Sequence, residues 1–254
     1  MTVTIDDYLP YAKDSDPSYL KYSYESSGDA VWVPLLEKAA AKLFGNYEAL
    51  NGGFEVNGFE MLHGGPKYFL YYGDYGYTAD EIWRLLSEED EQSSFITAGS
   101  FAGTGSDQDT NHVGLPYMHA FSVLGTQTVQ VTDSVQARLV KMRNPWNVEY
   151  YFGAWSDSSA QWNEELLAQA DHKPLDDGEY YIPVEDFVSY FETITIGKDV
   201  TGWKRSNHDV YADDESHEPT LLWSDDDTVY NTYEFTLKSK VEQEVYISLH
   251  TYTD

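Results

Sequence analysis

No cysteine occurs among the 254 residues of the chain. This absence excludes disulfide bonds, metal sites built on thiolates and a cysteine nucleophile within these residues. Basic residues are also scarce, because 15 Lys and Arg stand against 44 Asp and Glu, a formal net charge of -29. Non-specific nucleic-acid binding needs basic side chains that displace condensed counterions, so we expect no nucleic-acid partner. An acidic surface suits solubility, cations and basic protein partners.

Long apolar runs are missing too. No stretch reaches the roughly 18 apolar residues that a membrane-spanning helix requires. Residues 1–7 lack the basic segment and apolar run of a signal peptide. A chain without cysteine also suits a reducing compartment. We therefore expect an intracellular protein with no membrane span, in the cytoplasm or associated with the cytoskeleton.

Apolar and aromatic residues, by contrast, are abundant. Hydrophobic residues make up 41% of the chain, which includes 22 Tyr and 7 Trp. A chain of this length and composition is expected to fold, as one large or two small domains. The clearest helix covers residues 32–44, where Leu36 and Leu43 belong to an apolar face and Gly45 stands at the position of a C-terminal cap.

Further elements follow along the chain. Thr78 and Glu81 form a candidate capping box for a helix at 79–88, and shorter helices are predicted at 158–169 and 184–191. Two segments are interpreted as loops. Residues 52–65 are rich in Gly, and residues 93–111 are rich in Gly, Ser and Thr and are expected to be mobile. Alternating and β-branched segments predict four strands: 117–124, 128–132, 136–142 and 148–152. This pattern indicates an α+β fold in which helices flank an antiparallel sheet or barrel.

The composition changes near residue 198. Residues 199–229 are acidic and are interpreted as irregular, and 233–237 and 244–250 have the pattern of strands. Two strands are too few to be stable alone in water. We therefore expect two domains, 1–198 and 199–254, of which the second is part of a β-sandwich or completes a sheet supplied by a protein partner.

Two short motifs carry the candidate chemistry. His119 lies in Gly-Leu-Pro-Tyr-Met-His-Ala-Phe-Ser-Val-Leu-Gly (114–125), and Asn144 lies in Arg-Asn-Pro-Trp (143–146). A catalytic His needs a hydrogen-bonding residue that fixes its tautomer, and the spacing leaves room for a strand, a turn and a return strand that brings Asn144 alongside. Taken singly, the His is more often a packed core residue and Asn-Pro a common turn.

Together these motifs closely resemble the second half of the protease core of the calpain family, whose fold is papain-like. The resemblance covers residues 1–198, and its other segments are 3–10, 32–53, 153–162, 177–181 and 184–191. Residues 199–254 resemble, more weakly, the opening of the C2-like sandwich that follows a calpain core. By this resemblance His119 would be the general base and acid, Asn144 would orient its ring, and Trp146 would shield their hydrogen bond from water.

The half that bears the nucleophile is absent from these residues. We therefore expect a calpain-like cysteine protease domain that is inactive alone, a pseudoprotease acting as a scaffold, binding or regulatory subunit. The alternative is one half of an active calcium-dependent cysteine endopeptidase, with its Cys domain supplied by another chain or a missing segment. Three positions depart from the family pattern: Met118 and Asn147 replace glycines, and Phe121 replaces a tyrosine. Asn tolerates a positive φ better than most residues, so Asn147 can keep the turn.

The resemblance also implies calcium. Calcium prefers six to eight oxygen ligands, and the matching positions are Asp157, Asp177 and Glu179, with the Leu175 carbonyl as a further candidate. Tyr150 stands where another glutamate is expected, and the neighbouring side chain, Glu149, would point to the opposite face of a strand. Alternatively, Asp157 caps the following helix and Asp177 begins a hairpin turn.

Overall fold

A computed structural model describes residues 2–10, 31–62, 64–73, 75–103, 107–202, 220–223 and 229–232. Its contacts divide the chain into two compact units, Met1–Asp199 and Val200–Asp254. Within the described ranges, no helix is both long and apolar enough to cross a membrane.

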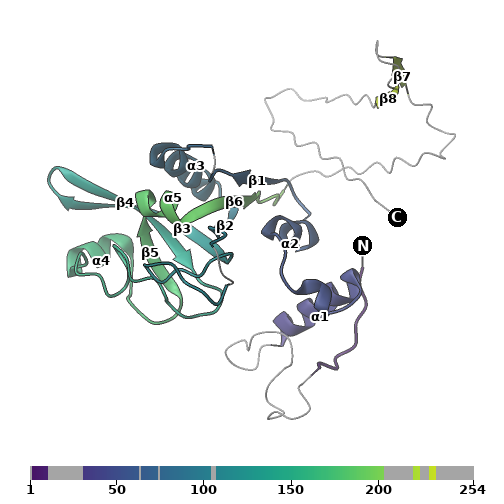
Figure 1. Cartoon of the computed structure of the whole chain (residues 1–254), viewed down its shortest axis with the longest axis horizontal. Coiled ribbons are helices and arrows are strands. Elements are labelled where there is room, and N and C mark those ends of the chain that lie inside the picture. The colour runs from purple at the N-terminus through teal and green to yellow at the C-terminus, as the bar shows by residue number, and fades with distance from the viewer. Residues whose placement is uncertain are drawn as a thin grey trace. The chain divides into compact units, whose positions relative to one another are not determined.

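A six-stranded sheet forms the centre of the first unit (Figure 1). Its strands are β1 (Lys67–Tyr71), β2 (Phe95–Ser100), β3 (Ala120–Thr132), β4 (Val135–Arg143), β5 (Glu179–Pro183) and β6 (Phe191–Gly197). They lie in the order β1-β6-β2-β3-β4-β5, and every neighbouring pair is antiparallel. The helices are α1 (Trp32–Phe44), η1 (Glu48–Leu50), α2 (Glu55–Leu62), α3 (Ala79–Glu91), α4 (Glu164–Ala170) and α5 (Val184–Tyr190). The expected α+β fold with an antiparallel sheet is confirmed.

The sheet has a hydrophobic core on each face. Strand β3 carries apolar side chains at Phe121, Val123 and Val129, all an even number of residues apart, yet the first two belong to one core and Val129 to the other. A register shift between Val123 and Gly125 explains this, because one extra residue reverses which face the following side chains occupy. Helices α3 and α5 contribute to the first core, and α4 contributes to the second.

Two predicted helices are confirmed, α1 at both of its ends and α3 at its start. Helix α1 covers residues 32–44 as expected, and Gly45 ends it with φ 102°. Helix α3 begins at the predicted capping box, in which the Thr78 side chain accepts from the Glu81 N–H and the Glu81 side chain accepts from the Thr78 N–H. It continues to Glu91, three residues beyond the expected end.

Both predicted loops were wrong in part. The segment 52–65 contains α2, and the segment 93–111 contains β2. The sequence pattern did not predict β2 because most of its residues are polar or small, and only Ile96 and Ala98 supply apolar side chains to the core. The flanking strands β3 and β6 select this segment as a strand, an effect of tertiary structure that a local pattern does not contain.

Other boundaries also differ. The predicted strands 117–124 and 128–132 form one strand, β3, and the predicted helix 158–169 starts only at Glu164, where the Asn163 side chain accepts from the N–H of Leu166. The expected strand 148–152 does not exist. Its backbone instead packs on the loop before β3, where Phe152 N–H donates to the carbonyl of Val113 at 3.0 Å.

The strands described in the second unit form one antiparallel pair, β7 (Thr220–Trp223) and β8 (Val229–Thr232). The segment 199–229 was expected to be irregular, and this expectation was wrong in part because the segment contains β7. The two strands predicted at 233–237 and 244–250 lie outside the described residues.

Candidate active site

His119 immediately precedes β3 and is 9% exposed. The backbone on both sides of its Cα is tied to the end of β2. Its N–H donates to the Ser100 Oγ at 3.0 Å, and its carbonyl accepts from the Ser100 N–H at 3.0 Å. The preceding residue, Met118, has φ 50° and turns the chain into the strand. The imidazole therefore stands on a fixed backbone.

The His119 ring contacts the predicted partner directly. Its Nε2 lies 2.9 Å from the Oδ1 of Asn144, which is 1% exposed. The Asn144 Nδ2 donates to the Val148 carbonyl at 3.1 Å, and the Oδ1 also accepts from the Trp146 N–H at 3.1 Å. Since Asn144 offers an acceptor to the ring, the Nε2 must carry the proton. The Nδ1 then holds the lone pair and can act as a base.

The turn that carries Asn144 is held by a second loop. Asn144 N–H donates to the carbonyl of Gly178 at 2.9 Å, and Asn147 N–H closes the turn on the Asn144 carbonyl at 3.0 Å. Asn147 has φ 59°, which confirms the positive φ expected at this position. Gly178 has φ 83°, and a Cβ there would lie 2.9 Å from the Asn144 carbonyl oxygen. Gly178 thus positions Asn144, a role that the sequence indicated only as a turn.

Aromatic rings surround the imidazole. The centroid of the Trp146 ring lies 4.1 Å from that of His119, at an interplanar angle of 40°, and Phe121 contacts it edge-on at 4.8 Å. Burial lowers the pKa of His119 below its usual value, although the hydrogen bond to Asn144 and the nearby charge of Asp107 act in the opposite direction. The site therefore favours a neutral imidazole, the form that a general base requires.

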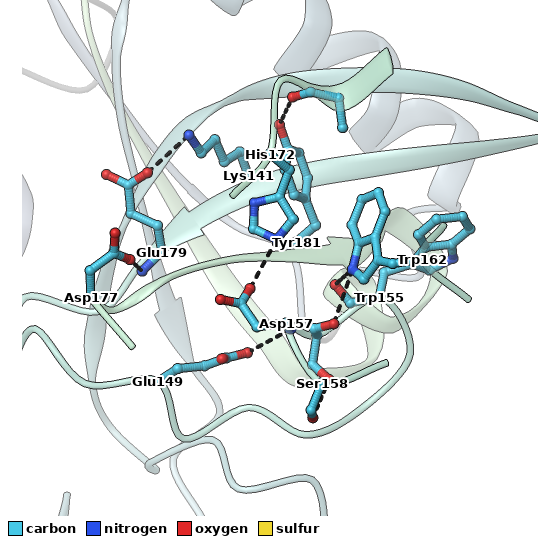
Figure 2. Close-up of polar contacts among 12 residues, drawn as sticks. Lys141, Glu149, Trp155, Asp157, Ser158, Trp162, His172, Asp177, Glu179 and Tyr181 are labelled. Carbon is cyan, nitrogen blue, oxygen red and sulfur yellow. Dashed lines mark hydrogen bonds and ion pairs between the residues drawn. The ribbon is translucent and has the colours of Figure 1, made fainter. Parts of the chain in front are cut away.

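The predicted calcium ligand Asp157 takes part in a network of polar contacts (Figure 2). Its Oδ1 is 3.0 Å from the Nε2 of His172, whereas its Oδ2 is buried without a hydrogen-bond partner. The Glu149 Oε1 accepts from the Asp157 N–H at 3.1 Å. Glu149 thus turns toward Asp157, and the expectation that it would point away was wrong because residues 148–152 are not a strand.

The other two candidate ligands have protein partners. Asp177 Oδ1 accepts from the Glu179 N–H at 3.0 Å, and Glu179 forms ion pairs with Lys141 at 2.9 Å and Arg143 at 3.6 Å. The Leu175 carbonyl accepts from the Asp177 N–H at 2.8 Å. Among the residues that the structure describes, no group of three or more His, Cys, Asp and Glu side chains is placed to hold a metal ion. In this arrangement the three predicted ligands do not form a calcium site.

His172 and Glu149 are polar residues in contact with Asp157 to which the sequence analysis gave no role. The His172 ring packs against Trp162 and Tyr181, each with a centroid distance of 5.0 Å. Burial raises the pKa of Glu149 to about 7, and the neighbouring charge of Asp157 adds to this effect. Asp157 therefore lies between the buried ring of His172 and the half-buried carboxyl of Glu149.

Comparisons with known proteins agree with the geometry. The model of the calpain family cysteine protease matches residues 1–198. Rat calpain-9 is 30% identical over 200 residues, which cover 77% of this chain and 28% of the relative. Human calpain-8 is 33% identical over 208 residues (76% and 27%), and the human calpain-1 catalytic subunit is 32% identical over 197 residues (76% and 26%). The chain thus matches little more than a quarter of each relative.

Proposed function

Because the chain belongs to the calpain family of cysteine proteases, we propose that it carries the general-base part of a cysteine-protease active site and is not an endopeptidase by itself. The observation that carries this proposal is the contact between His119 Nε2 and Asn144 Oδ1 at 2.9 Å, which leaves the Nδ1 as the basic nitrogen. Since these residues contain no Cys, the thiol must come from a residue outside this sequence.

In the assembled site, His119 Nδ1 would take the proton of that thiol and generate the thiolate. Asn144 would hold the resulting imidazolium through its Nε2–H, and Trp146 would exclude water from that bond. The thiolate would then attack the substrate carbonyl, and His119 would give its proton to the departing amine. A water molecule, deprotonated by the same Nδ1, would hydrolyse the thioester and restore the starting state.

The test combines this chain with a Cys-bearing calpain-like half, co-expressed with it, and measures cleavage of a casein substrate. We expect no cleavage by this chain alone and cleavage by the pair. In the pair, His119→Ala should abolish the cleavage and Asn144→Ala should reduce it. Asn163→Ala is the matched control, because this side chain caps α4 in the other core. Cleavage that survives His119→Ala would refute the assigned role of His119.

A second candidate function, a scaffold or binding subunit, is supported by helix α1. Segment 2–10 covers its polar side, where Lys42 donates to the Thr4 carbonyl at 2.5 Å and Lys38 binds Asp6. Its apolar residues Trp32 and Leu43, in contrast, are 65% and 40% exposed. Such a face suits a protein partner. Mass spectrometry of the native complex decides between the candidates: a stoichiometric Cys-bearing protease half favours the enzyme, and only non-protease partners favour the scaffold.

Calcium is the cofactor that we propose, with Asp157, Asp177 and Glu179 as ligands. The unpartnered Oδ2 of Asp157 supports this proposal, because a buried carboxylate oxygen without a hydrogen bond costs free energy that a cation would remove. Glu179 would have to exchange Lys141 for the ion. Thermal unfolding with calcium, magnesium or a chelator tests this: we expect calcium alone to raise Tm and Asp157→Asn to remove the effect. An equal Tm in all three conditions would contradict the proposal.

The proposed location is inside the cell, in the cytoplasm or associated with the cytoskeleton. The absence of cysteine supports a reducing compartment. Fluorescence microscopy of the tagged protein would test this location, and a signal confined to the secretory pathway would contradict it.

A further inference from the structure

The chain contains two Asn-Gly pairs, Asn51-Gly52 and Asn57-Gly58. Both asparagines are exposed, and neither side chain makes a hydrogen bond among the residues that the structure describes. The other asparagines described in the first unit all bind through their side chains: Asn46, Asn111, Asn144, Asn147 and Asn163. Residue type and exposure thus do not distinguish the two pairs, and the difference between them lies in the backbone.

An asparagine that precedes a glycine can lose its amide nitrogen without an enzyme, since asparagine is a thermolabile residue. The backbone nitrogen of the glycine gives up its proton and attacks the side-chain carbon Cγ. A C–N bond forms there, and the Cγ–Nδ2 bond breaks as ammonia leaves with that proton. Water then opens the five-membered imide at either carbonyl and leaves aspartate or isoaspartate. Glycine favours the attack because no Cβ obstructs the approach.

The backbone that follows Asn51 permits this attack. Asn51 ends η1, where its N–H donates to the Glu48 carbonyl at 3.1 Å, and its ψ of 84° is not helical. Gly52 has φ 86° and Gly53 has φ 154°, and nothing lies within 4 Å of a Cβ position at either. Among the described residues, neither glycine N–H donates to a backbone carbonyl. Rotation about the Cα–C bond of Asn51 therefore brings the Gly52 nitrogen toward the side chain without breaking a hydrogen bond of the described chain.

Asn57, in contrast, lies in the first turn of α2. Its N–H donates to the Phe54 carbonyl at 3.0 Å. Gly58 follows inside the helix, where the ladder of hydrogen bonds fixes the ψ of Asn57. The Phe59 ring of the same helix packs against Gly197 of β6, 3.4 Å from the position of a Cβ there. The attack at Asn57 therefore requires α2 to open.

We propose that Asn51 is a site of spontaneous modification in the folded chain, converted to aspartate or isoaspartate through the backbone nitrogen of Gly52, and that α2 protects Asn57 from the same reaction. The conversion adds a negative charge to the loop between η1 and α2. In the isoaspartate form the backbone runs through the former side chain and gains a methylene. Because Asn51 is exposed and space surrounds both following glycines, the fold accommodates either product. The reaction needs only water, so it is independent of the proposed function.

The test incubates the folded full chain in mildly alkaline buffer and follows both sites by mass spectrometry. Cleavage after glutamate places them on separate peptides, residues 49–55 and 56–60. We expect the first peptide to convert at least about tenfold faster than the second, the ratio that corresponds to an opening free energy of about 1.4 kcal/mol for α2. In urea, which unfolds α2, the two pairs should convert at similar rates.

Asn51→Gln should abolish the fast conversion, because a glutamine would have to form a six-membered ring. Asn57→Gln is the matched control and should leave the rate at Asn51 unchanged. Phe59→Ala removes the contact of α2 with Gly197 and should raise the rate at Asn57 without changing that at Asn51. Thermal unfolding of the fresh and the converted chain should give the same Tm.

Equal rates at the two sites of the folded chain would overturn the proposal, and so would faster conversion at Asn57. If Asn51 did not convert over the time in which the urea-unfolded chain converts, the fold would protect this loop as well, which also refutes the proposal. A rate at Asn57 that Phe59→Ala leaves unchanged would refute the protective role of α2. A lower Tm of the converted chain would contradict the expected accommodation by the fold.

Discussion

Asn144 accepts the Nε2–H of His119 at 2.9 Å, although 25 residues separate the two in the chain. His119 directly precedes β3, Asn144 directly follows β4, and the first paired residues inside them are Ser122 and Arg143. The hydrogen-bond ladder of these two strands therefore sets the distance between the ring and the amide. The contact exists within this chain and requires no second domain.

The titration of His119 follows from this contact. Because burial lowers the pKa of the ring, we expect a midpoint below 6.5 in an NMR pH titration. Asn144→Asp places a carboxylate at the Nε2 and should raise this pKa, since a negative charge stabilises the imidazolium. Asn163→Asp, which retains a capping side chain far from the ring, should leave it unchanged. A native midpoint at or above 6.5 would contradict the burial argument.

Gly178 should be sensitive to any side chain. Gly178→Ala forces an L-residue into φ 83° and places its Cβ 2.9 Å from the Asn144 carbonyl oxygen. Gly76→Ala is the matched control, with φ 68° and open space around the Cβ. The control should lose about 1–2 kcal/mol of unfolding free energy for its backbone conformation alone. We expect Gly178→Ala to lose more unfolding free energy than the control, measured by urea unfolding. An equal loss would mean that the turn at Asn144 moves to accommodate the Cβ at little cost.

Glu149 should make stability depend on pH. Its pKa is about 7 in the folded chain and near 4.5 when exposed, so between these values the folded state binds more protons than the unfolded state. Stability should therefore fall as the pH rises through this window. Glu149→Gln should remove part of that fall and stabilise the chain most at pH 8. Glu164→Gln, an exposed acid in α4, changes the net charge equally and should not alter the slope.

Removing one partner of the ion pair between Lys198 and Glu89 should lower the stability of the fold strongly, whereas removing both charges should lower it much less. The Lys198 Nζ lies 2.7 Å from the Glu89 Oε1 and 2.8 Å from the Gln92 Oε1, and both charged side chains are about nine-tenths buried. Lys198→Met leaves a buried carboxylate without its cation, which costs about 3–5 kcal/mol. Adding Glu89→Gln to this variant should recover most of the lost unfolding free energy, as measured by urea unfolding. No recovery in the double variant would show that Lys198 acts through packing.

Local signals in the sequence predicted the elements that local interactions determine. The capping box at Thr78 located the start of α3, and the apolar period with Gly45 located both ends of α1. The pairing of His119 with Asn144 was also anticipated, because the two motifs flank one hairpin. Asn147 was identified as a turn residue from its tolerance of positive φ.

What the sequence did not predict depends on contacts between distant segments. Strand β2 has few apolar residues and becomes a strand only between β3 and β6. The bulge near Gly125 changes the face of Val129 without altering the alternation of residue types. Glu149 reaches Asp157 because the backbone after Asn147 leaves the sheet, and His172 joins them from the end of α4. Such pairings appear only when the whole sheet is assembled.

The position of His119 and Asn144 at the end of one ladder has a consequence for how such a chain can diverge. Separating the two side chains would require unzipping β3 from β4, whose inward residues fill both cores. Mutations elsewhere that preserve the pairing of β3 with β4 will therefore preserve the relative placement of positions 119 and 144. The sheet thus fixes where the two side chains stand, whereas the reaction they can support depends on the thiol that is brought to them.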